Sequence, residues 1–73
     1  MRAYLCSIRD KNGLTKRELS QRLGISESYY NLIEHGSRQK NISVRFLYEL
    51  SKVLNVSVKT LIDQEIDYIN TNH

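Results

Sequence analysis

The segment LTKRELSQRLGISESYYNLIEHG, residues 14–36, decides the fold, because two short helical patterns meet within it at Gly24. The first pattern begins with a capping box, in which Thr15 accepts from the backbone of Glu18 and the Glu18 side chain reaches back to Thr15. Ser26 stands before the second pattern and is a natural N-cap. Only three residues, beginning with Gly24, separate the patterns. So short a connection favours a sharp angle over an antiparallel hairpin and predicts a helix-turn-helix motif.

The rest of the chain repeats these start and stop signals. Gly13, Gly36 and Asn55 follow apolar patterns of helical spacing and suit the left-handed position that ends many helices. Ser43 and Ser57 precede two further patterns as candidate N-caps. No stretch has the alternation of a strand, and proline is absent. We therefore predict an all-α fold of five helices, near residues 2–12, 16–23, 27–35, 44–54 and 58–69.

Length and cysteine content narrow the class of protein. A chain of 73 residues predicts one small domain without room for a cleft between lobes. A disulfide within the chain is excluded because Cys6 is the only cysteine. Cys6, His35 and His73 are scattered and lack the close ligand pairs of zinc sites, so we expect no metal. The start of the chain has no long apolar run, so we expect no signal peptide and no membrane span, and the lone thiol suits a reducing cytoplasm.

The net charge of +3 is unevenly distributed along the chain. Residues 1–48 carry nine Lys or Arg against four Asp or Glu, whereas residues 49–73 carry two against four. The first part therefore has a balance of +5 and suits an anionic partner, and the acidic tail lies apart from it. A solvated surface with uneven charge is the alternative explanation.

The predicted helix at residues 27–35 presents an unusual outward face. At 100° per residue, Tyr30 and Ile33 share the buried side, and Ser28, Leu32 and His35 point away from it. A solvated face is usually rich in Lys and Glu. Leu32 in particular would meet water unless a partner covers it.

Residues 14–62 resemble the helix-turn-helix domain of the phage repressor/Cro type, the Xre family. The matching elements are GLTKRELSQRLGIS, then YYNLIEHGSR, then FLYELSKVLNVSVKTLI. The resemblance implies a five-helix, lambda-repressor-like fold, with the third helix in the DNA major groove and a two-fold dimer on a near-palindromic operator. Two positions depart from the family pattern. Lys16 replaces the usual Gln, which exchanges an amide contact to phosphate for a charged one, and Ser20 replaces a usual Ala.

Carried onto this chain, the resemblance nominates four residues that read bases. Asn31 suits adenine N6 and N7, Leu32 suits a thymine methyl group, and Ser28 is compatible with several bases. Glu27 can accept from cytosine N4, although it can instead serve the positive end of its own helix.

Phosphate contacts are expected from cations and polar groups around this helix and from the loop GSRQKNIS, which lies beside a helix N-terminus. Neutralising about five or six phosphates per subunit makes binding steeply salt-dependent. A solvated loop is the alternative for Arg38 and Lys40. The expected contacts are Lys16, Arg17, Tyr29, Arg38, Lys40, Asn41 and Arg45.

Several other residues have structural explanations. The resemblance suggests that Arg9 and Glu34 form an ion pair between the first and third helices. Tyr30, Phe46 and Tyr48 are interpreted as packing residues. No Gly-rich phosphate loop, carboxylate pair or nucleophile motif is present, so we expect neither an enzyme nor a cofactor.

The segment IDQEIDYINTNH continues the last helix beyond the family core. We therefore divide the chain into a DNA-binding domain, residues 1–62, and a C-terminal extension, residues 63–73. Ile66, Tyr68 and Ile69 have little left to pack on in the monomer, so we expect them in a symmetric dimer interface. The alternative is that the extension folds back onto its own monomer.

Together these features predict a sequence-specific regulator of transcription that binds double-stranded DNA as a homodimer, most simply a repressor. Two alternatives within the same fold are the DNA-binding antitoxin of a toxin–antitoxin pair, which would add a protein partner, and the controller protein of a restriction–modification operon. An alternative of another class is a helical protein-interaction module whose Leu32 face meets a protein.

Overall fold

The computed structural model describes residues 1–71, which form five helices and no strand. His73, one of the scattered candidate metal ligands, lies outside the described residues. The all-α prediction is confirmed, and the boundaries of the three middle helices agree with those expected. In chain order the helices are α1 (Ala3–Lys11), α2 (Lys16–Leu23), α3 (Glu27–His35), α4 (Val44–Leu54) and α5 (Val58–Thr71).

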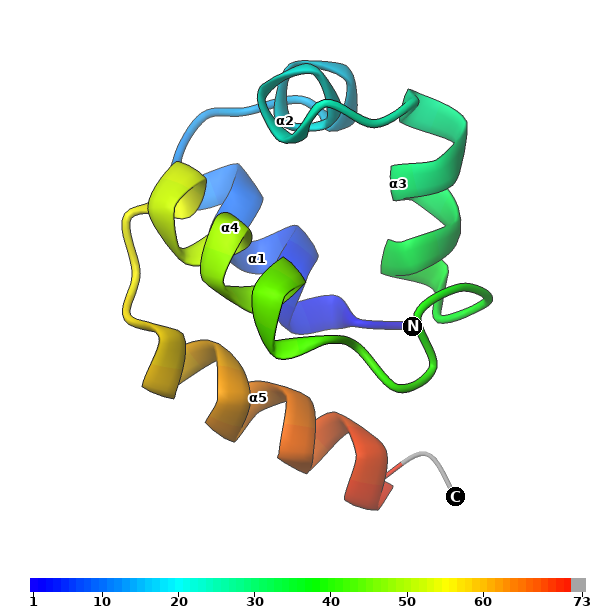
Figure 1. Cartoon of the computed structure of the whole chain (residues 1–73), viewed down its shortest axis with the longest axis vertical. Coiled ribbons are helices and arrows are strands. Elements are labelled where there is room, and N and C mark those ends of the chain that lie inside the picture. The colour runs from blue at the N-terminus through cyan, green and yellow to red at the C-terminus, as the bar shows by residue number, and fades with distance from the viewer. Residues whose placement is uncertain (72–73) are drawn as a thin grey trace.

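The predicted capping groups define the turn between α2 and α3. Thr15 Oγ1 accepts from the Glu18 amide at 3.0 Å, and Glu18 Oε1 accepts from the Thr15 amide at the same distance. Gly24 ends α2 at φ +72°, a conformation that side chains other than glycine rarely adopt. Ser26 then caps α3 by accepting from the Tyr29 amide at 3.0 Å. α3 leaves this turn at a sharp angle to α2, as the short connection predicts (Figure 1).

The helices pack around one apolar core. α1 and α4 lie in the middle of the view, with α2 above them, α3 to their right and α5 below (Figure 1). Tyr48 is the exception among the residues predicted to pack, because it is 49% exposed and its ring instead meets the Lys52 ammonium at 4.5 Å. The core side chains are Leu5, Leu14, Leu19, Tyr30, Ile33, Phe46, Leu47, Leu50, Leu54 and Leu61.

A buried ion pair joins α1 to the end of α3. Arg9 Nε lies 2.9 Å from Glu34 Oε2, and both side chains are buried. Arg9 also donates to the Leu14 carbonyl at 2.9 Å, so it fixes the start of the helix-turn-helix segment. The hydrogen bonds that Arg9 donates to Glu34 raise the pKa of the Arg9 guanidinium despite its burial. The pair thus sets where α3 lies relative to α1.

The first part of the C-terminal extension belongs to the same packed body. Glu65 is 3% exposed and pairs with Arg2 at 2.9 Å. The Arg2 guanidinium lies 5.0 Å from the centre of the Tyr68 ring, and the Tyr68 hydroxyl lies so close to Gly36 that a Cβ there would clash with it. The expectation that Tyr68 has little to pack on in the monomer is therefore wrong. Ile66 and Ile69 remain 49% and 38% exposed.

Candidate nucleic-acid interface

The outward face of α3 carries the predicted base-reading side chains. Glu27 and Ser28 are exposed in the first turn, and Leu32 is 37% exposed one turn later. Tyr30 and Ile33 are fully buried beneath them. The helix therefore presents short polar groups and one apolar group on a rigid base, which is the arrangement that a DNA major groove accepts.

Asn31 is held by a residue of the neighbouring helix. Lys16, the first residue of α2, donates from Nζ to Asn31 Oδ1 at 2.7 Å, and both residues are half-buried. This contact fixes the orientation of the amide and leaves Nδ2 as a donor at the interface. The lysine retains two further N–H donors, since an ammonium carries three. Lys16, which stands where the family pattern has Gln, thus brings a cation beside the amide.

The predicted phosphate contacts other than Tyr29 lie on α2, in the loop between α3 and α4 and at the start of α4. Arg17 is exposed on α2, and Arg38, Lys40 and Asn41 are exposed in the loop between α3 and α4. Arg45 lies 3.6 Å from Glu49, but its side chain is 89% exposed, so the pair is weak and the cation stays accessible.

The loop is attached to α3 by a residue that the sequence did not single out. Gln39 Nε2 donates to the Tyr29 hydroxyl at 3.0 Å, so Tyr29 supports the loop in addition to facing the interface. Gln39 has φ +55°, in the left-handed region that a residue with a side chain seldom adopts. Neither its type nor its neighbours indicated this conformation.

Arg2 and Glu65 form the second buried ion pair, and sequence reasoning missed both. Glu65 follows Leu61 by four residues and precedes Tyr68 by three, so the helical period places it on the buried stripe of α5. That spacing could have indicated that Glu65 is buried. Nothing in the sequence indicated the burial of Arg2, because a cation near the start of a chain usually faces solvent.

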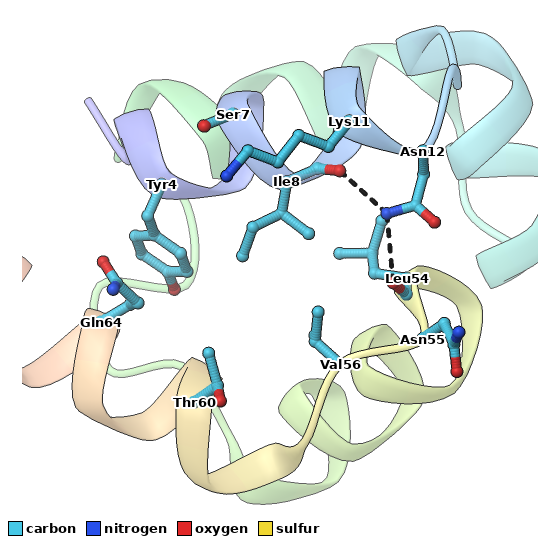
Figure 2. A pocket seen from close by; sticks show the side chains of 10 residues that line it. All are labelled: Tyr4, Ser7, Ile8, Lys11, Asn12, Leu54, Asn55, Val56, Thr60 and Gln64. Atoms are coloured by element: carbon cyan, nitrogen blue, oxygen red, sulfur yellow. Dashed lines mark hydrogen bonds between the residues drawn. The ribbon is translucent and has the colours of Figure 1, made fainter.

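A shallow groove lies between α1 and α5, apart from the predicted DNA contacts (Figure 2). Its volume is about 440 Å³, and Lys11 is the charged side chain among its lining residues. At one end Asn12 Nδ2 donates to the carbonyls of Ile8 and Leu54, at 2.9 and 3.1 Å. Asn12 therefore ties the end of α1 to the end of α4.

Within residues 1–71, no three His, Cys, Asp or Glu side chains are grouped so as to hold a metal ion. No helix in this part of the chain has the length and apolar character needed to cross a membrane.

Comparison with known proteins gives consistent matches. A family model described as helix-turn-helix matches residues 7–61. The HTH-type transcriptional regulator SinR of Bacillus subtilis (strain 168) is 40% identical over 57 residues, covering 78% of this chain and 50% of the relative. The SinR of Bacillus licheniformis is 39% identical over 57 residues with the same coverage.

A third relative extends these matches beyond Bacillus. The HTH-type transcriptional regulator y4dJ of Sinorhizobium fredii is 42% identical over 50 residues, covering 68% of this chain and 62% of the relative. The chain thus spans about half the length of the two SinR relatives. No solved structure matches it significantly.

Proposed function

This chain belongs to the Xre-like helix-turn-helix family of DNA-binding transcriptional regulators, and from that premise we propose that it represses transcription by binding a near-palindromic operator as a homodimer. The observation that carries the proposal is the α3 face, where Asn31 is fixed by Lys16 at 2.7 Å between exposed Ser28 and Leu32. Repression follows from occupying a promoter, which requires only tight and selective binding.

Base recognition is assigned to Glu27, Ser28, Asn31 and Leu32. The Lys16 contact uses Asn31 Oδ1 alone, so it leaves both N–H donors of Nδ2 and, because a carbonyl oxygen has two lone pairs, one acceptor site. The amide therefore keeps the donor and acceptor that adenine N7 and N6 require. Contact with a thymine methyl group removes part of the apolar surface of Leu32 from water. Glu27 lies in the first turn of α3, so it accepts from cytosine N4 or serves the positive end of the helix.

Phosphate recognition is assigned to the cations and amides on either side of α3. The group comprises Lys16 and Arg17 on one side and the loop between α3 and α4 with Arg45 on the other, with Tyr29 between them. About five or six contacts per subunit give a steep dependence of affinity on salt. These contacts position α3, and the base contacts then select the sequence.

The dimer is assigned to the exposed apolar residues of α5. Ile66 and Ile69 are three residues apart and therefore lie on one side of the helix. Tyr68 packs on Arg2 within the monomer, so it borders this surface and does not form its centre. A symmetric contact through Ile66 and Ile69 places two α3 helices for half-sites about one turn of DNA apart, about 10 bp.

Chemical-shift mapping tests the binding surface. The ¹⁵N-labelled chain is titrated with a 20-bp duplex of mixed sequence at low salt. Amides of residues 27–32 and 37–41 should shift, and those of α1 lining the groove near Lys11 should not. Shifts confined to residues outside α2, α3 and the following loop would contradict the proposal.

A further inference from the structure

A buried side chain with five hydrogen bonds, that of Arg2, lies away from the predicted DNA surface. Arg2 precedes α1 at the N-cap position, yet its side chain makes no cap and is 0% exposed. It lies among the segments that meet at the C-terminal end of α3. A buried guanidinium requires a specific set of acceptors, since leaving a charge unpaired there is unfavourable.

Five hydrogen bonds satisfy all five N–H donors of Arg2. Nε and Nη2 form a bidentate pair with Glu65, at 2.9 and 3.0 Å. Nη1 donates to the carbonyls of Ile33 and Arg38, at 2.7 and 3.1 Å. Nη2 also donates to the carbonyl of Gln39. Three of the five acceptors are therefore backbone atoms at the end of α3 and in the loop that follows.

These three carbonyls belong to the segment that carries the predicted phosphate contacts. Arg38 supplies its carbonyl to Arg2 while its side chain stays exposed, so the buried guanidinium anchors the backbone from which an exposed cation extends. Gln39, beside it, has φ +55° and is held both by Arg2 and by the Tyr29 hydroxyl. The loop geometry thus depends on a residue about 36 positions away in the chain.

On its other side Arg2 is fixed by α5. The Glu65 carboxylate accepts from Arg2 and also from the Tyr4 hydroxyl at 2.7 Å. The Tyr68 ring lies against the guanidinium, and the Arg2 backbone amide donates to the Glu34 carbonyl at 2.7 Å. The guanidinium is therefore held in one orientation, with its loop-facing donors directed at the three carbonyls.

We propose that Arg2 is a positioning residue of the DNA-binding surface, which holds the loop between α3 and α4 in the conformation that contacts phosphate, and that Glu65 of α5 keeps it in place. The inference rests on the proposed function. It makes α5 part of the phosphate-binding apparatus as well as the predicted dimer helix. Lysine cannot replace Arg2, because a single ammonium has three donors and cannot reach a bidentate carboxylate and three carbonyls together.

The test compares Arg2→Lys with Leu61→Val. Leu61 is buried on α5, the helix that carries Glu65. Shortening its side chain lowers stability while every Arg2 contact stays. Affinity for a duplex selected by the wild-type chain is measured across a salt series, at a temperature where both variants are folded by circular dichroism. Arg2→Lys should bind about tenfold more weakly. The slope of log K against log salt, which is negative, should become shallower by about one to two, as one or two phosphate contacts are lost. Leu61→Val should keep the wild-type slope.

Hydrogen exchange gives a readout that needs no DNA. The amides of Ser37 and Arg38 both donate to the Leu32 carbonyl, at 2.9 and 3.3 Å. They should exchange faster in Arg2→Lys than in Leu61→Val, while amides of α2 behave alike in the two variants. If Arg2→Lys does not fold, Glu65→Gln, which keeps one acceptor and the side-chain shape, serves in the same comparison.

The outcomes separate the two proposals. Wild-type chain that selects no duplex would overturn the proposed function, and accelerated exchange of Ser37 and Arg38 would still support the positioning role. Wild-type chain that binds its duplex, together with an Arg2→Lys variant of equal affinity, equal slope and equal exchange, would overturn the positioning role alone.

Discussion

Lys16 Nζ lies 2.7 Å from Asn31 Oδ1, so the first residue of α2 sets the orientation of the half-buried amide at the flank of the outward α3 face. A side chain that reads bases must be held in one rotamer, because freedom of rotation lowers both affinity and discrimination. Under the proposed function, the remaining donors of Lys16 contact a phosphate. The two helices of the motif therefore act together at this point.

Removal of the amide should weaken discrimination at one base pair. We expect Asn31→Ala to lose about 1–3 kcal/mol of preference there, while affinity for unrelated DNA stays nearly unchanged. Competition binding with duplexes substituted at each position measures this. Gln64→Ala, on the exposed side of α5, is a control of similar chemistry. An unchanged preference at every position would remove Asn31 from the base-reading set.

Loss of a loop cation should act on all sequences alike. Arg38→Ala should weaken binding to selected and random duplexes by the same factor. It should also make the negative slope of log K against log salt shallower by about one. Lys59→Ala is the matched control, because Lys59 pairs with Asp63 on α5 at 3.0 Å, away from the loop. Binding titrations at four salt concentrations measure both quantities. A change in sequence preference would instead assign Arg38 to base reading.

Disruption of the buried Arg9–Glu34 pair should destabilise the fold. Arg9→Ala leaves the Glu34 carboxylate buried without its partner, so we expect the free energy of unfolding to fall by about 3–5 kcal/mol. Urea denaturation measures the loss. The folded fraction should keep the wild-type sequence preference. Equal stability with an altered preference would contradict the structural assignment.

A polar residue at the exposed apolar surface of α5 should separate the subunits. Ile66→Asn should convert a dimer to a monomer in sedimentation velocity, because it removes apolar contact at the centre of a symmetric interface. Asp67→Asn on the same helix is the control. Truncation after Asp63 is a poor test, since it also removes Glu65 and so breaks the Arg2 pair. An unchanged dimer in Ile66→Asn would assign self-association to another surface.

The free energy of unfolding should decrease at alkaline pH. Burial, with a hydrogen bond to Glu65, raises the pKa of the Tyr4 hydroxyl, and burial beside Glu34 raises that of Tyr30. Each group contributes stability that is complete below its unfolded pKa of about 10 and is lost as the pH rises above that value. Urea denaturation between pH 8 and 11 should show a smaller decrease in Tyr4→Phe. A decrease as large as in the wild-type chain would contradict the assignment to Tyr4.

The helix ends could be predicted from the sequence, because the residues that define them are close by in the chain. The capping box at Thr15, the caps at Ser26 and Ser43 and the left-handed residues at Gly24 and Asn55 lie within a few positions of the helix ends that they define. Helical period likewise separated the buried Tyr30 from the outward Leu32. Local signals of this kind are readable from one chain.

The contacts that were missed join distant parts of the chain. Arg2 and Glu65 are 63 residues apart, and Lys16 and Asn31 are 15 apart on two helices. Such pairs depend on how the helices pack, which period and composition do not specify. Tyr48 was interpreted as a packing residue, but its side chain is 49% exposed.

Selection from a randomised duplex pool tests the central claim most directly. The full chain is used with repeated rounds at moderate salt, and the enriched sequences are read. We expect an inverted repeat with half-sites about 10 bp apart, whose enrichment disappears when Asn31 and Leu32 are both replaced by Ala. A pool that stays random, with weak binding equal for all duplexes, would contradict it and would assign the α3 face to a protein partner.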